Sequence, residues 1–223
     1  MTDTTAFTQW ILDHGVPETV LELLIAISVL ATVVSFARYI IGSKTYGIYA
    51  PILLAIAYSY TGLKYGLSIT FVVILTSLLS YSVLRRIRMH YITRIAANYT
   101  VLTMVLIAFF ILVDRFNLGL GNLSNIPPLA FISIAALSDF FIRQYVKKSL
   151  AGSILTLVGT IFVAAMGWFV ITRDVISQYM LNNLWVIPVL TLINLLLGQF
   201  SGLRIWEYFR FRNTNKEDES IQK

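Results

Sequence analysis

Leu150–Thr172 reads LAGSILTLVGTIFVAAMGWFVIT, an apolar run without a charged residue that lies between Lys148 and Arg173. A helix needs about 20 mostly apolar residues to cross the roughly 30 Å hydrocarbon layer of a bilayer. The stretch is therefore predicted to be a transmembrane helix, and the chain an integral membrane protein. The composition agrees, because 57% of the 223 residues are hydrophobic and 13% are charged, whereas soluble domains carry about 25% charged residues.

Six further apolar runs accompany this one, so seven transmembrane helices are predicted. The runs are Val20–Phe36, Tyr46–Tyr60, Leu67–Leu84, Ile95–Val113, Pro127–Ile142, Leu150–Thr172 and Leu184–Leu203. The second and fifth are short for a crossing, and a re-entrant hairpin is the alternative for each. Both are marked by proline, with Pro51 inside one and a Pro-Pro pair opening the other. The predicted fold is an all-α bundle of seven transmembrane helices whose spans two and five are short.

The basic residues decide between crossings and hairpins. If all seven runs cross, the loops of one side hold only Lys64, Arg115 and Arg173, and the other side collects 14 of the 17 Lys and Arg residues. The side rich in Lys and Arg is expected in the cytoplasm. A hairpin at either short run would flip every later loop and destroy this bias. We therefore predict an extracytoplasmic N-terminal segment (1–18), a seven-helix domain (19–212) and a disordered cytoplasmic tail (213–223).

Catalytic groups are scarce. The chain has no cysteine and only two histidines, His14 and His90, which are predicted on opposite sides of the membrane. Neither can serve a serine nucleophile in mid-membrane, and no HExxH motif is present to hold zinc. Spans six and seven contain no lysine for a retinal Schiff base. The sequence therefore predicts a protein that is not an enzyme and holds no metal or cofactor.

Polar residues near the spans are candidate functional residues, because they are costly in lipid. Asp139 and Arg143 stand four apart at the inner end of span five and are predicted to form an ion pair, with a structural role favoured over a substrate or proton site. Arg204 and Glu207 belong to a charged extension at the inner surface, where basic residues can hold anionic lipid headgroups. The small residues of span six favour packing inside the bundle, with a homo-oligomer interface as the alternative.

Two stretches resemble a bacterial family, the seven-helix membrane domain usually fused to an inactive transglutaminase-like domain. Arg38–Gly62 reads RYIIGSKTYGIYAPILLAIAYSYTG, and Leu197–Arg212 reads LGQFSGLRIWEYFRFR. The matching positions are Gly42, Lys44, Gly47, Pro51, Thr61, Gly62, Gly198, Gly202, Arg204, Glu207 and Arg210. Lys44, Pro51, Arg204 and Glu207 therefore join the ion pair as candidate functional residues.

The chain departs from the family pattern at two places. Pro188 is followed by Val189, where the family tends to carry an acidic residue. The family's Glu-Arg pair late in span five is replaced by Ala136-Leu137-Ser138-Asp139. If the family's action needs those acidic groups, this member has lost or moved it.

The resemblance implies a multi-pass protein of the bacterial cytoplasmic membrane. It implies two partners, an envelope-side transglutaminase-like protein and a cytoplasmic ATP-grasp ligase. The fused domain would lie outside, before span one, which agrees with the predicted topology. Because the sequence begins at Met1, we expect this member to be without that domain. The leading hypothesis is a non-catalytic interaction or signalling platform, with no nucleic-acid partner.

The alternative is a transporter of amino acids or peptides. Spans one to three and four to six would run with inverted topology, each triplet with a short, proline-marked middle span, as in inverted-repeat carriers.

Overall fold

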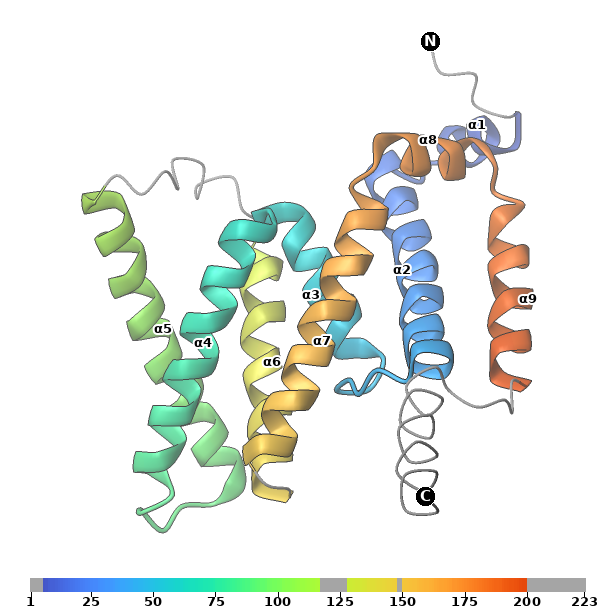
Figure 1. Ribbon diagram of the computed structural model, residues 1–223. Helices are drawn as coiled ribbons and strands as arrows, with labels where there is room; N and C mark the ends of the chain where they lie inside the picture. The colour runs from blue at the N-terminus through green and yellow to red at the C-terminus, as the bar shows by residue number, and fades with distance from the viewer. Residues whose placement is uncertain (1–5, 117–127, 148–149, 200–223) are drawn as a thin grey trace, which may run out of the picture.

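The computed structural model describes residues 6–116, 128–147 and 150–199, and every regular element within them is helical. The elements are α1 (Ala6–Asp13), α2 (Glu18–Phe36), the π-helical turn η1 (Ala37–Ile41), α3 (Tyr49–Thr61), α4 (Leu63–Leu84), α5 (Tyr91–Arg115), α6 (Pro128–Lys147), α7 (Leu150–Ile171), α8 (Asp174–Asn182) and α9 (Val186–Gln199). Successive helices from α2 to α7, with the short α3 included, run in opposite directions, and α9 runs opposite to α7 (Figure 1).

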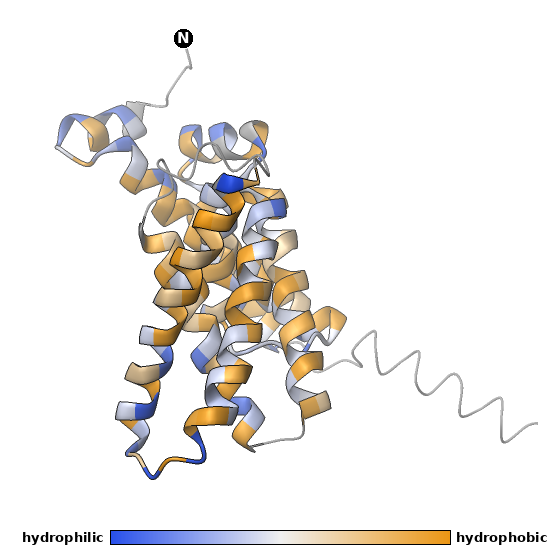
Figure 2. Cartoon of the chain, turned by 90° about the vertical axis from the view of Figure 1, so that its left-hand side faces the viewer, coloured by the Kyte–Doolittle hydropathy of each residue, from blue (hydrophilic) through white to orange (hydrophobic). Residues whose placement is uncertain are grey.

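Five of the helices are long and apolar enough to cross a bilayer, judged by length and composition. They comprise Glu18–Ile41, Leu63–Leu84, Tyr91–Val113, Leu129–Val146 and Leu150–Ile171. Figure 2 shows hydrophobic residues along the middle of the helices, with hydrophilic residues gathered at the turn between α4 and α5. The protein is thus an all-α membrane protein, as predicted.

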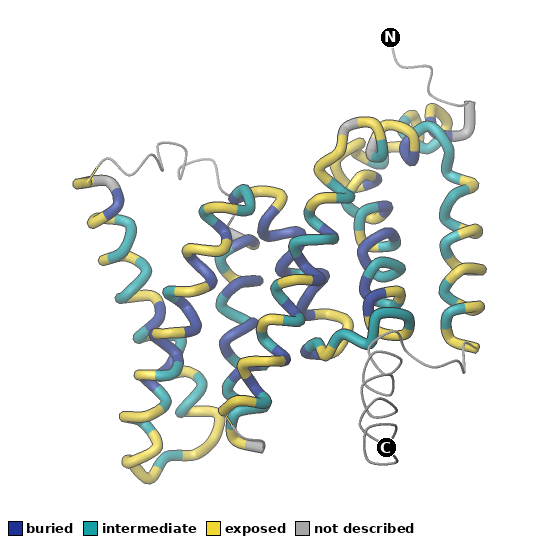
Figure 3. Tube along the Cα trace, viewed as in Figure 1, coloured by how far each residue is buried: buried dark blue, intermediate teal, exposed yellow. Residues whose placement is uncertain are grey.

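The short helix α3 forms the centre of the bundle, packed against α4, α6 and α7. Most of its residues are buried (Figure 3), including Tyr58, the largest fully buried side chain. The Tyr58 hydroxyl is paired with Thr70 Oγ1 of α4 at 3.0 Å. Pro51 occupies the third position of α3, where its missing N–H costs no helical hydrogen bond. A helix so enclosed by protein meets little lipid, so it need not be long.

The residues between η1 and α3 lie against α7. Gly42 ends η1 with a φ of 83°, a left-handed conformation that suits glycine. The Tyr46 N–H then donates to Thr160 Oγ1 at 3.0 Å, and the Tyr46 hydroxyl donates to the Ser153 carbonyl at 2.8 Å. Non-helical backbone next to membrane helices is tolerated where protein groups satisfy it. We call residues 42–48 the α2–α3 loop.

The small residues of α7 face the rest of the bundle, which supports their predicted role in internal packing. A Cβ built on Gly159 would lie 2.2 Å from the Lys44 carbonyl oxygen, and one built on Gly167 would lie 2.5 Å from Leu30 Cδ2. Only glycine permits such close approaches. Glycine at these two positions brings the α2–α3 loop and α2 against α7.

A second hydrophobic cluster lies at the opposite end from the α4–α5 turn. Leu21, Ile25 and Val29 of α2 pack there against Met180 and Leu181 of α8. Helices α1 and α8 lie across this end of the bundle (Figure 1). Helix α9 packs mainly on α2, and none of its described residues is buried.

Three helices differ from the sequence-based expectation. Helices α1 and α8 had not been predicted, because they are short and lack the long apolar run of a span. Helix α6 is 20 residues long, not short, because it continues past Ile142 to Lys147. Only α3, at 13 residues, remains a short middle span, so the two triplets expected of an inverted repeat are unequal. The end of predicted span seven, 200–203, lies outside the described residues.

Candidate functional site

The candidate site is a cleft of about 300 Å³ where the ends of α4 and α6 meet the start of α5. We call it the α4–α6 cleft. Its lining residues are Tyr81, Leu84, Tyr91, Arg94, Ile95, Asn98, Asp139, Ile142, Arg143 and Val146. The set joins two guanidinium groups, a carboxylate, an amide and two phenols to an apolar wall. Such a combination suits a ligand with both charged and apolar parts.

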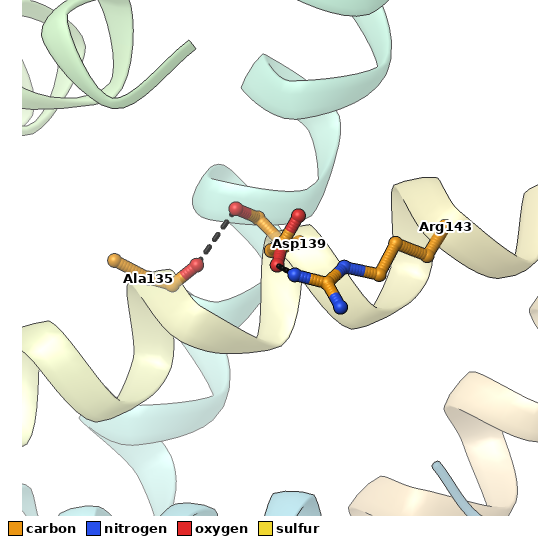
Figure 4. A network of polar contacts seen from close by, with 4 residues as sticks. Ala135, Asp139 and Arg143 are labelled. Atoms are coloured by element: carbon orange, nitrogen blue, oxygen red, sulfur yellow. Dashed lines mark hydrogen bonds and ion pairs between the residues drawn. The ribbon is translucent and has the colours of Figure 1, made fainter. Parts of the chain in front are cut away.

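Helix α6 supplies the predicted ion pair, which the structure confirms. Arg143 Nη2 lies 2.7 Å from Asp139 Oδ2, one helical turn away (Figure 4). Ser138, fully buried beside the pair, donates its hydroxyl hydrogen to the Ala135 carbonyl at 2.7 Å. The Arg143 side chain is 54% exposed and that of Asp139 19%. Because Arg143 is accessible, the pair contributes little stability, and both groups remain within reach of a ligand.

Helix α5 supplies Arg94 and Asn98, which sequence reasoning did not select as site residues. They stand four residues apart and share one face of the helix. The Arg94 guanidinium carbon lies 6.0 Å from the centroid of the Tyr81 ring, a cation–π contact. Tyr81 is in turn packed edge-on by Tyr145, with ring centroids 5.8 Å apart. The aromatic contacts hold Arg94 at the cleft.

Two buried polar atoms of these residues have no hydrogen-bond partner among the residues that the structure describes. Asn98 is only 4% exposed, and its Oδ1 accepts no hydrogen bond; Arg94 Nε donates none. An unsatisfied buried polar atom costs about 1–3 kcal/mol. Unpaired groups of this kind in a native protein call for an explanation, and a ligand is one.

The other predicted site residues lie elsewhere. Lys44 is exposed on the α2–α3 loop and lines a separate groove of about 300 Å³ together with residues of α7. Pro51 is buried in the first turn of α3. Arg204 and Glu207 lie outside the described residues. Of the four candidates that the structure describes, it therefore brings only Asp139 and Arg143 together.

Metal ligands do not cluster in the part of the chain that the structure describes. No group of three or more His, Cys, Asp or Glu side chains there could hold a metal ion. The chemistry of the α4–α6 cleft is that of hydrogen bonding, charge and apolar contact.

The helices and the cleft define a multi-pass all-α membrane protein. The family model described as "7 transmembrane helices usually fused to an inactive transglutaminase" matches residues 11–215, and the chain belongs to this family. Neither a curated protein nor a solved structure matches the chain significantly. The family's description associates this membrane domain with a transglutaminase that is itself inactive.

Proposed function

We propose that the protein is a non-catalytic membrane module that links an envelope-side transglutaminase-like domain or protein to a cytoplasmic partner such as an ATP-grasp ligase. The N-terminus lies outside, seven helices cross the bacterial cytoplasmic membrane, and the α4–α5 turn lies in the cytoplasm. The family's usual fusion supports the first partner.

The observation that carries this proposal is the attachment of α1 to the bundle. Thr8 Oγ1, almost fully buried, donates to the Leu181 carbonyl of α8 at 2.9 Å. Helix α8 connects α7 to α9 and packs on α2 through the cluster of Leu21, Met180 and Leu181. A displacement of α1 by a bound partner would therefore be transmitted through α8 to α2, α7 and α9. Trp10, which is 56% exposed on α1, offers an aromatic contact to a partner.

The opposite end presents a basic surface. The α4–α5 turn contains three exposed arginines, Arg85, Arg86 and Arg88. Such a surface favours a partner with an acidic patch and speeds their encounter. This surface lies at the end opposite α1, so the two ends can contact partners on opposite sides of the membrane.

Site-specific photo-crosslinking in native membranes tests this proposal. A photoreactive amino acid replaces Trp10 on α1 or Ile87 in the α4–α5 turn, both exposed. Leu155, equally exposed on the apolar surface of α7, is the matched control. We expect discrete protein adducts from the first two positions and lipid adducts from the control. Protein adducts from neither end would overturn the proposal.

The transporter hypothesis retains one supporting feature, the α2–α3 loop packed on α7, since carriers build their sites from interrupted helices. The unequal lengths of α3 and α6 speak against it. Uptake of amino acids or peptides by vesicles containing the purified protein is the measurement that would revive it.

A further inference from the structure

The α4–α6 cleft presents one unmatched donor and one unmatched acceptor close to a carboxylate. Within the described part of the chain, Arg94 Nε lacks an acceptor and Asn98 Oδ1 lacks a donor. Asp139, already paired with Arg143 through Oδ2, still has lone pairs for a second cation. A complementary ligand therefore carries an anionic oxygen and an N–H cation together. The amide torsion of Asn98 is soft, so its oxygen turns readily toward a ligand in the cleft.

The cleft also has an apolar wall formed by Leu84, Ile95, Ile142 and Val146. The cleft opens onto an apolar surface, since Val146 of this wall is itself 60% exposed. In a membrane protein such a surface contacts lipid. Lipid chains therefore lie next to the opening of the cleft.

The polar residues of the cleft lie near the end of a predicted span. The predicted fourth span begins at Ile95, so Arg94 stands just before it and Asn98 three residues inside it, about 5 Å along the helix axis. The headgroup layer extends roughly 5–8 Å beyond the hydrocarbon on each side. The polar atoms of the cleft thus lie near the boundary between headgroups and acyl chains.

We propose that the α4–α6 cleft binds a phospholipid whose headgroup carries a phosphate and a primary ammonium, as in phosphatidylethanolamine. The phosphate accepts hydrogen bonds from Arg94 and Arg143, a pairing that guanidinium groups favour. The ammonium donates to Asn98 Oδ1 and Asp139. The glycerol and the upper acyl chains contact the apolar wall.

Lipid binding to purified protein in detergent, followed by native mass spectrometry, tests the proposal without any mutation. Phosphatidylethanolamine and phosphatidylcholine form the decisive pair, because they share the phosphate but only the first has N–H donors. We expect phosphatidylethanolamine to bind about tenfold more tightly, the worth of one charge-assisted hydrogen bond. Equal binding of the two lipids, or of phosphatidylglycerol and phosphatidylethanolamine, would overturn the proposal.

Variants locate the site. Asn98→Leu is expected to reduce the preference for phosphatidylethanolamine, because only Asp139 then accepts from the ammonium, and Arg94→Gln to weaken its binding about tenfold. Arg88→Gln is the control, because Arg88 is an exposed arginine at the same end that does not line the cleft. Binding that Asn98→Leu and Arg94→Gln leave intact would contradict the assignment, as would an equal loss in Arg88→Gln. The ligand pair on the wild-type protein stays decisive if a variant fails to fold.

A competition experiment separates a lipid from a soluble ligand with the same headgroup chemistry. Free phosphoethanolamine offers a phosphate and a primary ammonium without acyl chains. We expect millimolar phosphoethanolamine to leave the bound lipid in place, because it lacks the apolar contacts. Displacement at that concentration would overturn the lipid as the occupant. A photoreactive amino acid in place of Tyr91, which lines the cleft, tests for a protein occupant. A protein adduct from that position would also overturn the proposal.

Discussion

Replacing Gly159 by alanine is expected to destabilise the protein by about 2 kcal/mol, although alanine is the better helix former. The added methyl group would lie 2.2 Å from the Lys44 carbonyl oxygen and 3.1 Å from Ser43 Oγ. The first of these atoms is backbone and cannot rotate away. The α2–α3 loop would have to retreat by at least about 0.8 Å to restore the 3.0 Å that real Cβ atoms require.

The magnitude combines three effects. Overpacking a close contact costs about 1–3 kcal/mol. A loop displaced from α7 also strains the 3.0 Å hydrogen bond from Tyr46 N–H to Thr160 Oγ1, and its loss adds about 0.5–1.5 kcal/mol. The higher helix propensity of alanine offsets about 1 kcal/mol of this cost.

The assay is reversible unfolding of the detergent-solubilised protein, titrated with sodium dodecyl sulfate and followed by tryptophan fluorescence. Gly198→Ala is the matched control, because Gly198 is helical too and a Cβ there would have no described residue within 4 Å. We expect that control to unfold at the wild-type concentration or above it. A Gly159→Ala variant as stable as Gly198→Ala would refute the close packing of the loop on α7.

Three further predictions concern single polar contacts. Tyr46→Phe removes the hydroxyl bonded to α7 and should cost about 1 kcal/mol in the same titration; an unchanged midpoint would contradict the contact. Thr8→Val removes the bond to Leu181 and should speed proteolysis of α1 while the long helices stay protected, whereas unchanged cleavage would mean that α1 is held otherwise. A double-mutant cycle of Asp139→Asn and Arg143→Gln should give a coupling below about 1 kcal/mol, since Arg143 is largely exposed; a coupling above about 2 kcal/mol would mean that the pair is desolvated.

The apolar runs located the long helices well, because burial in lipid requires an apolar side chain at nearly every position. The run Leu150–Thr172 differs from α7 by one residue. The same criterion underestimated α6, whose last turn passes Arg143 and reaches Lys147. An apolar run marks the part of a helix that lies in hydrocarbon, and the helix itself ends where its capping and tertiary contacts end.

The ion pair could be predicted because its partners are four residues apart on one helix. The cleft could not, because Tyr81, Arg94 and Asp139 come from three helices and no spacing in the sequence says which helices pack together. The polar pair Arg94 and Asn98 at the start of a span was the one available indication. Helices α1 and α8 were missed because neither has the long apolar run that identifies a span.

The measurement that tests the central claim most directly is cysteine labelling in intact cells. The chain has no native cysteine, so each single substitution reports one position. We expect Lys64→Cys, at the junction of α3 and α4, to react with a membrane-impermeant maleimide added from outside. Arg88→Cys, in the α4–α5 turn, should react only after the membrane is permeabilised. A protected Lys64→Cys together with a reactive Arg88→Cys would contradict the predicted topology, because it requires either that α3 does not cross or that the whole bundle is inverted.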